Sequence, residues 1–299
     1  MKKSLLHKNS SKKRIPDNFL GLDIEYPSYE DAKVTVIPVA YEGTVTYGKG
    51  AAKGPKAIID ASKHVETYER ELGKNIFDIY TLEGVTKKGA PEDVVNEVYN
   101  AVKKEINNKK QVVVLGGEHS ITIGAVKAFK EKFYDLSVLQ IDAHSDLRQE
   151  YEESRYSHAC VMRRIFDMNV PFVQVGIRSF CDEEADFIKK NKLKPFYAED
   201  IYDNDEWMDD AISRLSDNVY LTFDLDGLDP SIMPATGTPE PGGLGWYQAI
   251  KFLKKTAKAK NIVGFDIVEL APIKKLSFPD FIAAKLTYKM IGYCFFDAT

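Results

Sequence analysis

The sequence lacks the features that would direct it to nucleic acid or to a membrane. Its 299 residues carry 41 Lys and Arg against 45 Asp and Glu, a net charge of -4, so no basic excess is present to hold a phosphate backbone or an anionic lipid surface. No apolar run approaches the roughly 20 residues needed to span a bilayer, and the lysine-rich N-terminus has no apolar segment behind it. We therefore expect a cytoplasmic protein whose partner is neither nucleic acid nor a membrane.

Cysteine is also scarce. The three cysteines, Cys160, Cys181 and Cys294, are far apart and form no CxxC pair. An odd number of widely spaced cysteines predicts neither a disulfide framework nor a thiolate zinc site. We expect buried, free thiols.

The sequence predicts one α/β domain behind a loose tail. Residues 1–17 are rich in Lys, Ser and Asn and are expected to form the tail. From residue 18 to 299, short apolar runs alternate with helical patterns, without a repeat or linker, which favours a single catalytic domain. The runs VVVL and SVLQI are apolar on both faces, which is typical of a parallel sheet covered on both sides. We therefore expect a three-layer α/β/α fold with a central, mostly parallel sheet.

The element boundaries follow from the same patterns. Expected strands are 33–39, 111–115, 136–141, 172–175, 219–223 and 261–268. Expected helices are 54–68, 91–107, 122–132, 181–191, 205–215 and 245–259, with a packed helix beginning at residue 278.

Three of the five histidines lie in or after segments that follow expected strands. Ligands bind outside the carboxyl ends of the strands in parallel α/β sheets, so this placement points to a site. His119 lies in GGEHS, directly after one strand. Taken alone, this motif is as compatible with a turn or cap as with a ligand.

The string DAHSD follows the next strand. If the chain is extended there, Asp142, His144 and Asp146 point to the same side. Two carboxylates and a histidine at a buried strand end are costly unless a cation neutralises them. Folding needs alone do not explain this cluster.

A further strand ends in FDLDGLDP, where Asp224 and Asp226 point to the same side. Asp229, which precedes a proline, is expected only to stabilise an ordinary turn. Four carboxylates would balance two divalent cations, with His119 and His144 as neutral ligands. A nitrogen and oxygen ligand set without sulfur suits Mn, and less distinctively Mg, Fe or Zn. Two such ions can share one activated water.

These motifs resemble those of the ureohydrolase family, which includes arginases and agmatinases. The matching strings appear in the family's order and span about residues 116 to 271: GGEHS, DAHSD, YSHAC, FDLDGLDP, TGTPEPGG and DIVEL. A weaker stretch, Thr46–Ile58, extends the likeness to nearly the whole chain. The resemblance implies an arginase-like fold and a homo-oligomer, commonly a trimer or hexamer.

The resemblance also implies two Mn²⁺ ions and their ligands. The first ion would be held by His119, Asp142, Asp146 and Asp224, and the second by Asp142, His144, Asp224 and Asp226, with Asp142 and Asp224 bridging. It implies that Glu269 pairs with the substrate guanidinium and that Asp146 and His158 deliver a proton to the leaving amine. From residues alone, Glu269 would be a solvated charge. Asp266 has no clear task, Glu118 is expected either to support a site residue through a hydrogen bond or to be structural, and His7 and His64 are expected to be non-catalytic.

The substrate is expected to be a small cationic guanidine, and agmatine is the first candidate. Arginases have an asparagine where this chain has Arg148, and an aspartate where it has Cys181, and both departures disfavour arginine. We expect agmatine to be hydrolysed to putrescine and urea by a hydroxide that bridges the two ions, as a step of polyamine biosynthesis. Arginine, aminopropylagmatine, guanidinobutyrate and formiminoglutamate stay open, because Arg148 could serve an anionic substrate.

The acidic loop and the rival activities leave further alternatives. Glu150, Glu152 and Glu153 either attract a distal ammonium or only pair with Arg148 and Arg155. A binuclear phosphoesterase is disfavoured because its GDxHG and GNHE elements are absent. A non-catalytic relative is disfavoured because all six ligand candidates, His158 and Glu269 are present.

Overall fold

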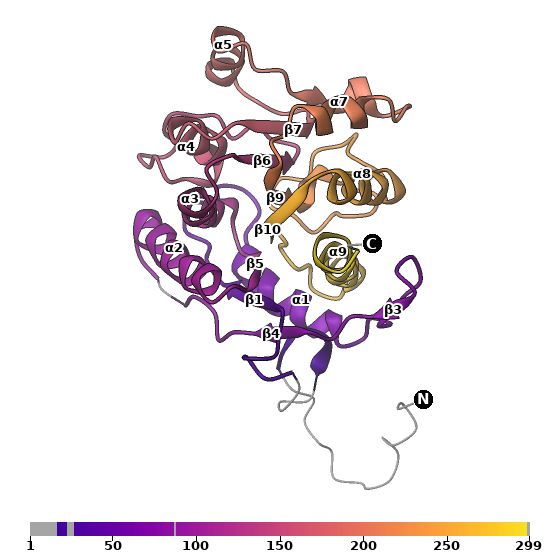
Figure 1. Ribbon diagram of the computed structural model, residues 1–299. Helices are drawn as coiled ribbons and strands as arrows, with labels where there is room; N and C mark the ends of the chain where they lie inside the picture. Colours follow the sequence, from indigo (N-terminus) through magenta and orange to yellow (C-terminus); the bar gives the residue numbers. More distant parts are fainter. Residues whose placement is uncertain (1–16, 23–26, 87, 298–299) are drawn as a thin grey trace, which may run out of the picture.

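An eight-stranded sheet forms the centre of the computed structural model, which describes residues 17–22, 27–86 and 88–297 (Figure 1). Every strand pairing within this sheet is parallel. In spatial order the strands are β4 (Ile79–Thr81), β1 (Val34–Val39), β5 (Gln111–Gly116), β10 (Asn261–Val268), β9 (Asn218–Asp224), β6 (Leu136–Ile141), β7 (Phe172–Ile177) and β8 (Phe196–Tyr197). A separate antiparallel pair joins β2 (Tyr68–Glu69) to β3 (Lys74–Asn75).

Helices cover both faces of the sheet (Figure 1). One layer holds α2 (Pro91–Asn107), α3 (Thr122–Lys132), α4 (Val161–Asp167) and α5 (Asp182–Lys190). The other holds α1 (Gly54–Ser62), α7 (Trp207–Ser213), α8 (Trp246–Ala259) and α9 (Phe278–Phe295), and the short α6 (Ala198–Ile201) follows β8. The expected three-layer α/β/α architecture is confirmed.

Each helical layer packs against one face of the sheet over its own apolar core, and the strands contribute side chains to both cores. In β5, Val112 and Val114 belong to the core under α2, α3 and α4, whereas Val113 and Leu115 belong to the core under α1, α8 and α9. All four are fully buried. Side chains alternate across a strand, so a strand that is apolar at every position must be covered on both faces. The run VVVL therefore has the environment that its composition predicts.

Most element boundaries agree with the sequence, but one helix is shorter than predicted. The helix expected at 54–68 ends at Ser62, and residues 68–69 form β2 instead. The buried Ser62 hydroxyl donates to the Ile59 carbonyl and accepts from the Leu20 N–H, so the chain leaves the helix where the N-terminal segment crosses it. The sequence patterns also did not predict four short elements: β4, β8, α4 and α6. Apart from Asp17, the expected tail at 1–17 lies outside the described residues, as does His7.

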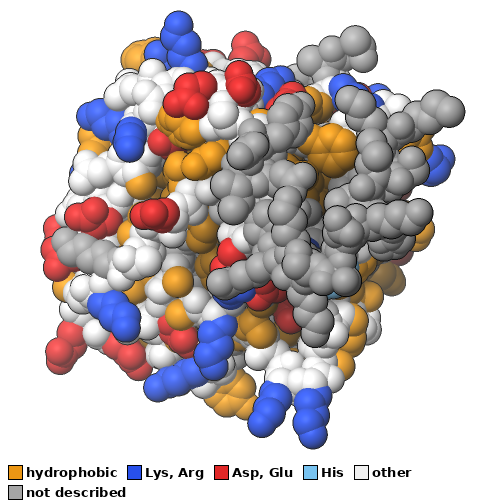
Figure 2. All heavy atoms as spheres, turned by 90° about the horizontal axis from the view of Figure 1, so that it is seen from below, with side chains coloured by type: hydrophobic (Ala, Val, Ile, Leu, Met, Phe, Trp, Pro, Cys, Tyr) orange, Lys and Arg blue, Asp and Glu red, His pale blue; other side chains and the backbone are white. Residues whose placement is uncertain are grey.

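The surface shows no long stretch of one charge on the side seen in Figure 2, where acidic and basic side chains are interspersed among the described residues. Such mixing gives no extended field of one sign on that face. Of the helices in the described ranges, none has both the length and the hydropathy to cross a bilayer.

The three thiols are free, with Cys160 buried and the other two half-buried, so the prediction of buried thiols holds fully only for Cys160.

The strand order determines where a site can form. The chain passes from β5 to β6 across two positions that β9 and β10 fill later, so β5, β10, β9 and β6 become neighbours in the middle of the sheet. Carboxyl ends of parallel strands all lie at one sheet edge. The loops that follow these four strands therefore meet.

We predict that Gly124→Ala destabilises the fold. Gly124 of α3 lies against α2, and a Cβ there would be 2.2 Å from the Val95 carbonyl oxygen. Overpacking costs about 1–3 kcal/mol, which outweighs the gain in helix propensity of about 1 kcal/mol. Urea denaturation measures the loss. Lys132→Ala, on the exposed part of the same helix, should change stability by less than about 0.5 kcal/mol. Equal stability of Gly124→Ala and the parent would contradict the close approach of the two helices.

Candidate metal centre

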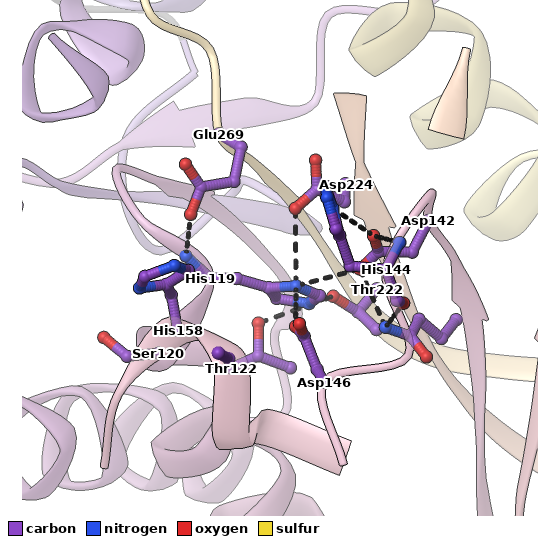
Figure 3. Close-up of polar contacts among 12 residues, drawn as sticks. His119, Ser120, Thr122, Asp142, His144, Asp146, His158, Thr222, Asp224 and Glu269 are labelled. Carbon is purple, nitrogen blue, oxygen red and sulfur yellow. Dashed lines mark hydrogen bonds and ion pairs between the residues drawn. The ribbon is translucent and has the colours of Figure 1, made fainter. Parts of the chain in front are cut away.

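The residues expected to bind metal come together at the edge formed by β5, β10, β9 and β6. His119 lies in the short 3-10 helix after β5 and Glu269 directly follows β10. Asp224 is the last residue of β9, and Asp226 lies in the 3-10 helix that follows it. The loop after β6 brings Asp142, His144 and Asp146. Figure 3 shows the side chains of His119, Asp142, His144, Asp146, Asp224 and Glu269 gathered around one space.

The Nδ1 atom of His119 faces three carboxylates. It lies 3.2 Å from Asp142 Oδ2, 3.0 Å from Asp146 Oδ2 and 3.4 Å from Asp224 Oδ2. The atom is buried and has no hydrogen-bond partner in the described part of the chain. The other ring nitrogen, Nε2, lies 2.9 Å from Thr222 Oγ1. A buried, unpartnered imidazole nitrogen that faces carboxylate oxygens fits a divalent cation.

His144 makes a second cluster beside the first. Its Nδ1 lies 3.1 Å from Asp226 Oδ2 and 3.6 Å from Asp142 Oδ1. In each of two groups the ligand atoms lie within 4.8 Å of one another: His119, Asp142 and Asp224 in one, and Asp142, His144 and Asp226 in the other. Asp142 belongs to both groups, so one carboxylate can contact two ions.

The buried carboxylates repel one another. Burial, together with the charges of Asp226 and Asp142, raises the pKa of Asp224 well above its usual range. Burial and the Asp142 charge raise the pKa of Asp146 to about 7. Asp146 and Asp224 therefore resist ionisation, whereas hydrogen bonds with His119 and His144 lower the pKa of Asp142. Divalent cations would remove this cost, so the residues present fit a metal pair.

The backbone reaches this arrangement differently from the extended chain that the motif spacing suggested. Asp146 has a φ of +53° and therefore lies in the left-handed region. Asp226 lies within a 3-10 helix, Leu225–Gly227, rather than in an extended segment. The extended backbone that the sequence suggested is therefore wrong, although the side chains do lie together. Turns at the strand ends, not strand periodicity, bring the side chains together.

A buried hydrogen-bond network, which the sequence did not reveal, holds His119. Thr222 Oγ1, next to His119 Nε2, donates to Asp266 Oδ1 at 2.6 Å. Asp266 Oδ2 also accepts from Thr122 Oγ1 at 2.8 Å and from Tyr220 Oη at 2.7 Å. Asp266 is fully buried and orients Thr222, which in turn orients the His119 ring. The signal that could have found it was a carboxylate inside an otherwise apolar strand, which needs polar partners.

Glutamines on two neighbouring strands support Asp142 in a similar way. Gln140 Nε2 donates to Asp142 Oδ2 at 2.7 Å, and Gln174 Nε2 donates to Gln140 Oε1 at 2.7 Å. These glutamines are register partners on β6 and β7. Hydrogen bonds between buried glutamines of neighbouring strands thus fix the position of the Asp142 carboxylate.

Glu118 supports neighbouring parts of the chain rather than lining the cavity. Its buried carboxylate accepts the N–H groups of Gly43 and Thr44 at 2.6 and 2.7 Å and so holds the loop after β1. Gly117 permits this approach, since a Cβ there would be 1.9 Å from the Tyr41 carbonyl oxygen.

Glu269 lies beside the two clusters and faces the same space. It has a φ of +66°, its N–H donates to Gly117 O at 2.8 Å, and its Oε1 accepts from the His119 N–H at 2.6 Å. Burial, with the charge of Glu118, raises its pKa well above the usual range. A carboxylate held in this way and only 7% exposed is prepared for a cationic partner.

A cavity of about 290 Å³ opens onto these residues. Its walls include His119, His144, Asp146, Asp224, Asp226 and Glu269, and also His158, Arg148 and Cys181. Tyr47 and Phe180 line it too and are 81% and 41% exposed, so they lie at its mouth. The two positions that departed from the arginase pattern, Arg148 and Cys181, thus contact the same space as the metal residues.

The acidic loop forms a tight turn rather than a wall of the cavity. Glu152 and Glu153 have φ values of +47° and +62° between Tyr151 and Ser154, which exchange two backbone hydrogen bonds of 3.0 Å. Positive φ at both central residues is typical of a type I′ turn. The expected surface pairs are not those observed, since Arg148 lies 3.9 Å from Glu184 and Arg155 lies 3.4 Å from Asp167. Asp229, by contrast, accepts from the Ser231 and Gly242 N–H groups, as turn chemistry predicts.

Comparison with known proteins places the chain in a family. The family model described as Arginase family matches residues 32–292. The chain belongs to the arginase family. This membership makes it a hydrolase of guanidino C–N bonds in a family that depends on a binuclear metal centre.

Individual relatives share most of this chain. It is 41% identical over 276 residues to the N(1)-aminopropylagmatine ureohydrolase of Synechocystis sp., with 89% of this chain and 90% of the relative covered. It is 34% identical to the agmatinase of Pyrococcus horikoshii, covering 92% and 97% of the two chains. The crystal structure of agmatine ureohydrolase of Thermoplasma volcanium aligns with a TM-score of 0.84 at 32% identity, covering 95% of this arginase-family chain and 94% of the other.

We predict that Thr222→Val weakens metal binding about 10–100-fold, because His119 loses the partner that orients its ring. Calorimetric titration with Mn²⁺ measures the change. Thr287→Val is the matched control: this threonine is equally buried, but its hydroxyl donates to the Ala283 carbonyl within α9. Equal losses of affinity in the two variants, or none in either, would contradict the orienting role.

Proposed function

We propose that this arginase-family enzyme is a ureohydrolase of guanidino polyamines that acts on N(1)-aminopropylagmatine first and agmatine second. The observation that supports this most directly is the buried His119 Nδ1 among three carboxylates, with Glu269 beside it and a cavity that opens onto both residues. The order of the two substrates follows the relatives, of which the aminopropylagmatine ureohydrolase shares 41% identity and the agmatinase 34%. This reverses the order expected from the sequence, where agmatine came first.

Two Mn²⁺ ions are the proposed cofactors. One would be held by His119, Asp142, Asp146 and Asp224, and the other by Asp142, His144, Asp224 and Asp226. A nitrogen and oxygen donor set without sulfur supports manganese. When bound, such a pair would lower the pKa of water and so supply the nucleophile near neutral pH.

The chain's own residues would orient the substrate and move the proton. Glu269 would bind the guanidinium, since a planar cation with several N–H donors matches a carboxylate. His158 lines the same cavity, and burial lowers its pKa, which keeps the ring neutral and able to accept a proton. Asp146, which contacts His119 and also lines the cavity, would pass the proton toward His158 and the leaving amine.

The cavity supports a substrate without an amino acid end. An arginine substrate would bring a carboxylate and an α-amino group to the region of Arg148 and Cys181. Arg148 is already engaged, over the Tyr151 ring at 4.7 Å and 3.9 Å from Glu184, and Cys181 carries no charge to hold an ammonium. Tyr47 and Phe180 place exposed aromatic rings at the mouth, and aromatic rings attract alkyl chains and cations. A role in polyamine biosynthesis and a homo-oligomeric state remain part of this proposal.

We expect Mn-loaded protein to release urea from aminopropylagmatine and from agmatine, with the larger kcat/KM for aminopropylagmatine, and to leave arginine and guanidinobutyrate nearly untouched. A colorimetric urea assay with the four substrates in parallel measures this. Asp224→Asn should reduce urea to the uncatalysed background. Asp217→Asn is its control, because this aspartate lies just before the same strand and its side chain is 95% exposed. Rapid hydrolysis of arginine would overturn the substrate proposal, and no urea from any of the four would overturn the function.

We expect Glu269→Gln to lower kcat/KM by roughly two orders of magnitude, because a buried charge pair with the guanidinium becomes a neutral contact. The Mn²⁺ content should stay at the parent value, since Glu269 belongs to neither ligand cluster. Steady-state kinetics and metal analysis of the same sample test both statements. A parallel loss of metal would mean that this carboxylate is a ligand instead.

A further inference from the structure

Three distant parts of the chain meet at the hydroxyl of Thr44. Thr44 Oγ1 lies 2.8 Å from Glu118 Oε1, 3.0 Å from the backbone nitrogen of His158 and 3.0 Å from His158 Nδ1. Thr44 follows β1, Glu118 follows β5, and His158 begins the 3-10 helix before α4. Thr44 is 9% exposed and Glu118 fully buried, so water competes little for these contacts.

The carboxylate of Glu118 determines the direction of the first bond. Its Oε2 accepts the N–H groups of Gly43 and Thr44, which can only donate, and its Oε1 also accepts from Ser120 Oγ at 2.7 Å. A carboxylate that receives these donors acts as an acceptor. The Thr44 hydroxyl therefore donates its single proton to Glu118.

The proton count then determines the state of His158. Having given its proton to Glu118, Thr44 offers only lone pairs to His158, so the Nδ1 atom must carry the hydrogen between them. Ser157 Oγ could also donate a hydrogen to Nδ1, but at 3.4 Å it is farther away than Thr44 Oγ1 at 3.0 Å, so the Thr44 contact decides the tautomer. A neutral imidazole has one N–H, so Nε2 keeps its lone pair.

We propose that Thr44 is a positioning residue that holds neutral His158 in the Nδ1–H tautomer and leaves Nε2 as the atom that takes up and returns the proton. The inference rests on the proposed role of His158 in the cavity. In the opposite tautomer Nε2 would already carry a hydrogen and could not accept one. Thr44 therefore acts through His158 and needs no contact with substrate.

Nitrogen-15 NMR of the enzyme labelled at its histidines tests the tautomer directly. The sample is loaded with Zn²⁺, which is diamagnetic, and the His158 signals are assigned by their loss in His158→Asn. We expect Nδ1 to be protonated and Nε2 to be unprotonated in the parent enzyme. A protonated Nε2 in the parent would overturn the proposal without any reference to a variant of Thr44.

Substitutions at Thr44 then link the tautomer to turnover. Thr44→Val, which keeps the shape and removes the hydroxyl, should mix the two tautomers and lower kcat of the Mn enzyme about 10-fold with KM within about 2-fold, a part of what acid–base catalysis contributes. Thr44→Ser should restore both. Ser120→Ala removes the other hydroxyl bound to Glu118 Oε1 and should leave the His158 tautomer unchanged.

The outcomes separate this inference from the function on which it rests. An unchanged tautomer and kcat in Thr44→Val would overturn the positioning role, and so would failure of Thr44→Ser to restore kcat. Full kcat in His158→Asn would overturn the proton-transfer role of His158 and with it the catalytic part of the inference. Absence of urea release from the parent enzyme would overturn the proposed function, while the NMR result would still decide the tautomer.

Discussion

Mutual repulsion among buried carboxylates is the constraint around which the structure is arranged. Four aspartates lie at one sheet edge beside the imidazoles of His119 and His144, and each is less than 7% exposed: Asp142, Asp146, Asp224 and Asp226. Without cations such a cluster costs free energy, and the raised pKa values of Asp146 and Asp224 express that cost. The fold therefore has to hold the cluster in place by other means, and it does so with fully packed strands beneath it.

The strand order supplies this support. Because β9 and β10 are inserted between β5 and β6, four consecutive strands of the sheet end beneath the site, and each is buried on both faces. The same strands carry polar groups one layer below the ligands. Asp266 and Thr222 act beneath His119, and Gln140 acts beneath Asp142. Side chains locked by such hydrogen bonds lose little further entropy when an ion binds, which favours a preformed site.

Sequence reasoning reached the fold and the site residues by different routes. Runs that are apolar on both faces predicted a covered parallel sheet, and motifs at strand ends predicted the ligands. Local pattern could not show the left-handed φ of Asp146 and Glu269, because these turns are stabilised by distant contacts such as that between Glu269 and the His119 N–H. The supporting pairs are equally non-local: Thr44 and His158 are 114 residues apart, and Thr222 and His119 are 103 apart. No periodicity links such positions, so only the folded chain reveals them.

Charge balance implies that the two ends of the proposed substrate would be recognised differently. Four aspartates would neutralise two divalent ions, and Glu184 lies near Arg148, which leaves the charge of Glu269 for one guanidinium. A second or third ammonium of a polyamine would thus find no unpaired buried carboxylate among the cavity-lining residues of the described chain. It must remain hydrated at the mouth, beside the exposed rings of Tyr47 and Phe180. On the proposed function, agmatine and aminopropylagmatine would differ only in this outer part, so the choice between them would rest on weak contacts at the mouth, whereas buried charge would select the guanidinium.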